Sequence, residues 1–233
     1  MSAQLMVALD FNQACDAFEL IDKLNPKTCA LKIGHELFTL AGSHFVQQVV
    51  TRGFKVFLDL KFHDIPNTVA RACAVAADLG VWMINVHALG GAAMMQAAQK
   101  ALDVYRHERP LLIAVTMLTS LMQEDLEELG IQSSVNQQVA RLALLAQKSG
   151  LDGVVCAALE VPDIKALCGH GFLAVTPGIR WETNSSDDQA RVVDVQQALA
   201  LGSDYMVIGR PITRASDPIA VVKGILDVIN AVI

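Results

Sequence analysis

The sequence lacks the marks of several protein classes. It contains no Cys-x-x-Cys pair and no Cys/His cluster with zinc-ligand spacing, and its five cysteines are odd in number. This pattern predicts reduced thiols in a cytoplasmic protein rather than a disulfide framework or a metal site. No uninterrupted apolar run reaches the ~18 residues of a membrane span. The first residues show no signal-peptide pattern, so we expect neither secretion nor membrane insertion.

Positive charge is also scarce. Eighteen Lys and Arg residues stand against 24 Asp and Glu residues, which gives a net charge of −6. A nucleic-acid-binding domain usually presents a basic surface, so we expect no nucleic-acid partner. The chain is 53% hydrophobic and only 18% charged, a composition that supports a large buried core. Its 233 residues suit a single domain spanning 1–233.

Eight short apolar runs recur along the chain and predict strands. Most are rich in Val, Ile, Leu or Phe without strict alternation, as expected for strands buried on both faces of a parallel sheet. The predicted strands are 5–9, 29–33, 55–60, 82–86, 111–115, 153–156, 172–175 and 205–208.

Segments with helical periodicity alternate with these runs. The predicted helices are 12–24, 43–52, 66–79, 91–105, 135–149, 160–168, 194–201 and 217–231. Eight alternating β and α units predict an α/β fold, a (β/α)8 TIM barrel, for which ~250 residues are typical. An open doubly wound sheet is the alternative, but no Gly-x-Gly-x-x-Gly follows the first strand.

Charged residues follow the apolar part of the third predicted strand. Asp59 and Lys61 are two residues apart, so in a regular strand both side chains point into the barrel mouth, near Lys32 of the neighbouring strand. Buried charges are costly unless each is paired. The cluster therefore indicates either a catalytic centre or a structural ion-pair network.

The connections after the seventh and eighth strands predict a phosphate site. They supply Gly178, Arg180, Gly209 and Arg210, and these two connections often bind phosphate in TIM barrels. Glycine allows backbone N–H groups to approach an anion, while arginine offers bidentate contacts. Two polar connections, 119–134 and 181–188, are candidate lids over such a site.

Residues 59–68, DLKFHDIPNT, resemble the signature of the orotidine 5'-monophosphate decarboxylase family. Further matching landmarks follow in order at 7–10, 31–34, 118–120, 176–180 and 208–212, so the resemblance spans essentially the whole chain. It implies decarboxylation of orotidine 5'-monophosphate to UMP and CO2, the last step of UMP biosynthesis. No site for a Schiff base, thiamine or pyridoxal cofactor is evident, so we expect no cofactor and no metal.

The resemblance also implies residue roles. Lys32, Asp59, Lys61 and Asp64 would form an alternating charge network in which Lys61 protonates C6 and Asp59 lies beside the substrate carboxylate. Asp64 and Thr68 would reach the active site of the partner in a homodimer. The other implied contacts are Asp10 and Lys32 to the ribose, Ser120 and the backbone near Thr119 to the pyrimidine, and Gln189, Arg180, Gly209 and Arg210 to the phosphate.

Three other functions compete with this interpretation. A Mg²⁺-dependent sugar-phosphate decarboxylase or aldolase of the same barrel superfamily shares the Asp-x-Lys-x-x-Asp element of strand three. Such enzymes typically place a glutamate at the end of strand two, where this chain has Lys32, which would repel a cation. A non-catalytic phosphate-ligand sensor would not need the charge cluster. Indole and imidazole biosynthetic barrels share the phosphate loops but lack the 59–68 segment.

Overall fold

The computed structural model of the chain describes residues 4–181 and 192–231. Eight parallel strands close into a barrel in the order β1-β10-β7-β6-β5-β4-β3-β2. They are β1 (Gln4–Ala8), β2 (Ala30–Gly34), β3 (Val56–Phe62), β4 (Met83–His87), β5 (Leu111–Val115), β6 (Gly153–Val155), β7 (Leu173–Thr176) and β10 (Tyr205–Ile208). The predicted (β/α)8 barrel and each of its eight strands are confirmed.

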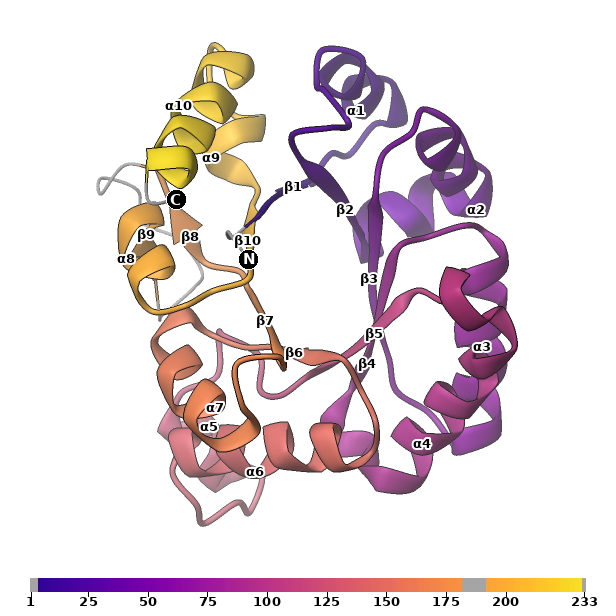
Figure 1. Cartoon of the computed structure of the whole chain (residues 1–233), viewed down its shortest axis with the longest axis vertical. Coiled ribbons are helices and arrows are strands. Elements are labelled where there is room, and N and C mark those ends of the chain that lie inside the picture. The colour runs from indigo at the N-terminus through magenta and orange to yellow at the C-terminus, as the bar shows by residue number, and fades with distance from the viewer. Residues whose placement is uncertain (1–3, 182–191, 232–233) are drawn as a thin grey trace.

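Helices cover the outside of the barrel, with α10 and α1 flanking the junction between the last and first strands (Figure 1). The eight that match predicted helices are α1 (Ala14–Ile21), α2 (His35–Thr51), α3 (Pro66–Asp78), α4 (Gly91–Leu102), α6 (Val135–Lys148), α7 (Val161–Cys168), α8 (Val195–Ala200) and α10 (Pro218–Ala231). The predicted start of α2 at residue 43 was wrong. Gly42 has a positive φ of +67° and interrupts the helix, so the turns before it do not continue the apolar periodicity of the turns after it.

Several short elements in the connections were not predicted. The 119–134 segment contains α5 (Gln123–Glu128), and α9 (Arg210–Thr213) follows β10 directly. After β7 the chain forms β8 (Ile179–Arg180), which pairs with β9 (Val193–Asp194). Three 3-10 turns are η1 (Ala88–Gly90), η2 (Asp103–Glu108) and η3 (Ala158–Glu160). Each is too short to show a periodic apolar pattern. Within the described ranges, no helix is long and apolar enough to cross a bilayer.

The strands are buried on both faces, which explains the lack of strict apolar alternation in their sequences. One set of side chains fills the barrel, and the other packs between strands and helices. The interior set is Met6, Ala8, Ala30, Phe57, Met83, Ile113, Val175 and Val207. At the N-terminal ends of the strands, the rings of Trp82 and Tyr205 meet edge to face at 5.2 Å, and both pack against this interior set.

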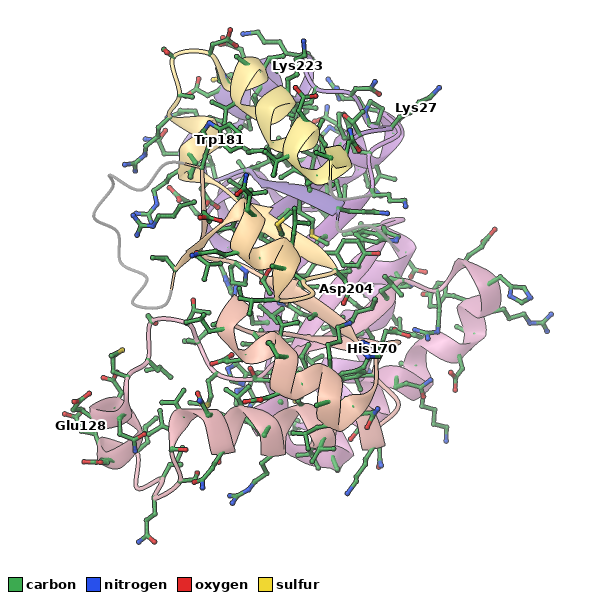
Figure 2. All side chains as sticks on the ribbon, turned by 60° about the vertical axis from the view of Figure 1, so that its left-hand side comes forward. Lys27, Glu128, His170, Trp181, Asp204 and Lys223 are labelled. Atoms are coloured by element: carbon green, nitrogen blue, oxygen red, sulfur yellow. The ribbon has the colours of Figure 1, made fainter. Side chains whose placement is uncertain are left out.

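A buried ion pair fixes α7 to the N-terminal ends of β7 and β10. The carboxylate Oδ2 of Asp204, labelled with His170 in Figure 2, accepts from Lys165 Nζ at 2.6 Å and from the N–H of Ala174 at 2.7 Å. The same ammonium donates to the carbonyls of Phe172 at 2.8 Å and His170 at 3.1 Å. The Lys165 side chain is only 8% exposed, so its charge depends on these partners.

We predict that Asp204→Asn lowers the free energy of unfolding by about 3 kcal/mol, because it leaves a buried ammonium without its counter-charge. The matched control is Asp22→Asn, which removes the partner of Arg52 in an ion pair on the surface. That change should cost no more than about 1 kcal/mol. Urea unfolding of the three proteins measures both values, and equal losses in the two variants would contradict the assignment.

Candidate functional site

A cavity of about 230 Å³ opens at the C-terminal ends of the barrel strands. Four cationic and two anionic side chains line it, a net charge of +2 in a chain whose total is −6. The lining residues are Ala8, Asp10, Lys32, Phe57, Asp59, Lys61, Thr119, Val155, Pro177, Gly178, Ile179, Arg180, Val207, Gly209, Arg210 and Pro211. The site is therefore locally suited to an anionic ligand.

Charges of opposite sign alternate along one wall of the cavity. Lys61 Nζ lies 2.7 Å from Asp59 Oδ1, and Lys32 Nζ lies 3.5 Å from Asp59 Oδ2 and 3.4 Å from Asp10 Oδ1. The side chains of Asp59 and Lys32 are only 13% and 11% exposed. Because water reaches them poorly, each charge relies on its neighbours for stabilisation.

Strand β3, which carries Asp59 and Lys61, is irregular. From Leu58 to Phe62, β3 advances four residues while β4 advances two, and Lys61 adopts a left-handed backbone with φ +49°. Asp59 and Lys61 therefore do not share a face through regular strand geometry, contrary to the prediction. Their side chains meet through a bulge instead. The N–H of Lys61 donates to Asn85 Oδ1 at 2.7 Å, a contact for which sequence reasoning assigned no role.

Gly209 makes room for Asp10. A Cβ at position 209 would lie 2.7 Å from Asp10 Oδ2 and 3.3 Å from the Cβ of Ala8. A Cβ at this position would therefore require the Asp10 carboxylate, which pairs with Lys32, to shift. Gly209 therefore acts on the charge row as well as on the loop expected to hold phosphate.

The connections after β7 and β10 place the predicted phosphate-site residues on one cavity. Gly178, Arg180, Gly209 and Arg210 all line it. Trp181 is the first residue of the predicted lid 181–188. Its ring packs against α10, since a Cβ added at Gly224 would lie only 2.7 Å from it (Figure 2).

Some predicted site residues lie elsewhere. Residues 182–188 and Gln189 are outside the described residues. Thr119 lines the cavity, whereas Ser120 is exposed and absent from its described lining. Asp64 and Thr68 are also exposed and absent from that lining, and Asp64 Oδ1 accepts from the N–H of Ile65 at 2.6 Å.

Two histidines stack beside the charge row. The rings of His63 and His87 are 5.3 Å apart and nearly parallel, at 19°. Burial, then the charges of His63 and Lys61, lower the pKa of His87 to about 4. His87 is therefore neutral near pH 7 and leaves Lys61 as the cation at this point. In the part of the chain that the structure describes, no group of three or more His, Cys, Asp or Glu side chains is arranged to hold a metal ion.

The chain is similar to proteins of known identity over nearly its full length. It is 58% identical over 226 residues to the orotidine 5'-phosphate decarboxylase of Legionella pneumophila (strain Paris), covering 97% of this chain and 99% of the relative. It is 56% identical to that of Psychromonas ingrahamii, covering 96% of each.

Solved structures and a family model agree with this similarity. The crystal structure of orotidine 5'-phosphate decarboxylase from Lactobacillus acidophilus matches with a TM-score of 0.87 and 39% identity, covering 98% of this chain and 99% of the other. An uncharacterized conserved protein from Geobacillus kaustophilus matches with a TM-score of 0.86 and 42% identity, covering 97% and 100%. The family model matches residues 3–225. The chain therefore belongs to the orotidine 5'-phosphate decarboxylase / HUMPS family.

Proposed function

We propose that this chain, as one barrel domain of residues 1–233, decarboxylates orotidine 5'-monophosphate to UMP and CO2, the last step of pyrimidine nucleotide biosynthesis. The observation that carries the proposal is the row Asp10, Lys32, Asp59 and Lys61, in one cavity with Arg180 and Arg210. The row suits a reaction that creates negative charge on carbon, and the arginines suit a phosphate. The five cysteines, four of them buried, fit a cytoplasmic location.

The reaction needs a cation beside C6 of the pyrimidine. When the bond to the carboxylate breaks, CO2 leaves and the electron pair stays on C6 in the plane of the ring. That pair is not conjugated with the ring carbonyls, so fixed charge must stabilise it. The Lys61 ammonium meets this need and then transfers a proton to C6, which leaves a neutral amine that solvent reprotonates.

The neighbouring groups orient the nucleotide and hold Lys61 in place. Asp59 accepts from Lys61 at 2.7 Å, and it would lie beside the substrate carboxylate. Asp10 and Lys32 would contact the ribose hydroxyls, while Ser120 and the backbone near Thr119 would hold the pyrimidine. Arg180, Gly209, Arg210 and Gln189 would hold the phosphate, with 181–188 closing over it.

Lys32 argues against the metal-dependent alternative. Its ammonium lies 3.5 Å from Asp59 Oδ2 and 3.4 Å from Asp10 Oδ1. It occupies the strand-two position where a sugar-phosphate aldolase would offer a carboxylate to Mg²⁺. A divalent cation bound between these carboxylates would be repelled by that ammonium.

We predict that Lys61→Ala lowers kcat by at least ~10³-fold, because it removes both the stabilising charge and the proton donor. Loss of orotidine 5'-monophosphate absorbance in the presence of EDTA measures the rate for wild type and variant. Wild-type activity should be insensitive to EDTA. Retained activity in the variant would remove Lys61 from its role, and restoration of an EDTA-inhibited wild type by Mg²⁺ would favour the aldolase.

Binding energy from the distant phosphate must contribute to catalysis. Enzymes lower barriers by roughly 8–23 kcal/mol, and a reaction without an electron sink needs the upper part of that range. One ammonium cannot supply all of it. Contacts to the phosphate that fix the nucleotide at Lys61 supply a further part.

We therefore predict that Arg210→Ala lowers kcat/KM by about 10²-fold or more, although it acts on the phosphate rather than on C6. The matched control is Arg214→Ala, which removes an exposed arginine at the end of α9 that is absent from the described cavity lining. Steady-state kinetics on both variants measure the difference. Equal kcat/KM in the two variants would contradict a phosphate site at Arg210.

We also propose that two copies of the chain form a homodimer with shared active sites. Asp64 lies on the connection from β3 to α3 and Thr68 lies in the first turn of α3, and both are exposed at the cavity end of the barrel. Apolar side chains on the connections at this end are also exposed. They are Ile65 (68%), Met122 (47%), Leu89 (43%) and Leu118 (40%). Exposed apolar surface around a site supports a partner that covers it, and Asp64 and Thr68 would then enter the partner's cavity.

Mixed dimers test this sharing. Lys61→Ala and Asp64→Ala homodimers should both be nearly inactive. Co-expression in equal amounts should restore about a quarter of wild-type activity, because half the dimers are mixed and each has one complete site. Activity no greater than the sum of the two homodimers would contradict the shared site.

A further inference from the structure

Asn85 places a fully buried amide inside the barrel. It lies on β4, two residues beyond the interior residue Met83, and its exposed fraction is 0%. An amide in an otherwise apolar barrel is unfavourable unless its donor and acceptor are both used. Its hydrogen bonds therefore indicate why a polar residue occupies this position.

Both ends of the amide contact the charge row. Asn85 Oδ1 accepts from the backbone N–H of Lys61 at 2.7 Å, and Asn85 Nδ2 donates to Asp59 Oδ1 at 2.7 Å. The neighbours fix this orientation, because the reversed amide would place its carbonyl against the carboxylate and its NH2 against an N–H donor. Asn85 thus links the backbone of Lys61 to the carboxylate that binds the Lys61 ammonium.

The backbone of Lys61 is in an unfavourable conformation. A φ of +49° is uncommon for a residue with a side chain, and here β3 carries two residues more than β4 across the same interval. Such conformations persist where surrounding contacts hold them. The hydrogen bond from Lys61 N to Asn85 is one such contact, and it acts at the residue whose ammonium must face C6.

We propose that Asn85 is a positioning residue for decarboxylation, holding the Lys61 backbone in its left-handed conformation and orienting the Asp59 carboxylate toward both lysines. The inference rests on the proposed function. Asn85 sets the place of the ammonium relative to the nucleotide, so its loss lowers kcat more than it changes KM.

Two substitutions test the two hydrogen bonds of Asn85. Asn85→Ala removes both bonds. Asn85→Asp keeps an acceptor for Lys61 N but places a second carboxyl group against Asp59 Oδ1, the oxygen that also binds the Lys61 ammonium, while Lys32 lies near Asp59 Oδ2. Two carboxylates in contact cannot both ionise easily, so one keeps a proton and donates it as the amide did. At higher pH this proton is lost and the carboxylates repel each other.

Kinetics with orotidine 5'-monophosphate across pH 5–9, with thermal unfolding in parallel, test the proposal on the full-length protein. Asn85→Ala should lose about 10²-fold in kcat with little change in KM, as expected for a misplaced catalytic group. Asn85→Asp should be most active at acid pH and lose activity, relative to wild type, as pH rises. Asp204→Asn is the control, because it weakens the opposite end of the barrel and leaves the cavity residues intact.

Three results would overturn the proposal. One is a loss of kcat in Asn85→Ala no larger than that in Asp204→Asn at the same folded fraction. Another is a pH profile of Asn85→Asp parallel to wild type. The third is failure of Asn85→Asp to fold at acid pH, where its protonated carboxyl should replace the amide. An inactive wild type would instead reject the proposed function.

Discussion

Three donors converge on the carboxylate of Asp59. Lys61 Nζ and Asn85 Nδ2 each donate to Oδ1 at 2.7 Å, and Lys32 Nζ lies 3.5 Å from Oδ2. Without this carboxylate, two ammoniums would share one poorly solvated wall. Like charges 4 Å apart repel by about 4 kcal/mol at an effective dielectric constant of about 20. Asp59 is therefore the group that allows two cations to stand beside a nucleotide.

The N-terminal ends of the strands carry stabilising contacts, and the C-terminal ends carry the cavity. At the N-terminal ends of the strands, Arg109 binds Asp152 through two contacts of 2.7 Å, and Asp152 also accepts from the N–H of Leu112 at 2.8 Å. These contacts fix strands and have no access to the cavity. The opposite end carries the left-handed Lys61, the buried Asn85 and the exposed loops. Stable contacts at one end thus compensate for the strain and the poorly solvated charges at the other.

Much of this architecture could be predicted from the sequence. Eight apolar runs alternating with eight helical patterns are enough to indicate the barrel, because each run is buried on both faces. Strand ends then indicate which side chains meet, since every βα connection opens at the same end. Lys32, Asp59, Arg180 and Arg210 were placed in one site by this rule, and the cavity contains all four.

What could not be predicted depends on geometry that no local pattern encodes. The bulge at Lys61 arises from the register between β3 and β4, not from a propensity within either strand. Asn85 interrupts an apolar run, which is a visible signal, but its partners are 24 and 26 residues away in the sequence. Asp64 and Thr68 are exposed and do not line their own cavity, and only the family resemblance assigns them a role.

The central claim is that the Lys61 ammonium stands at C6 of the bound pyrimidine. A crystal structure of the protein with a UMP-like nucleotide in the cavity measures this directly. We predict Lys61 Nζ within about 3–3.5 Å of C6, with Asp59 still bound to it and the phosphate on Arg180 and Arg210. A Lys61 side chain turned away from the ring, or a divalent cation seated between Asp59 and Asp10, would contradict the account.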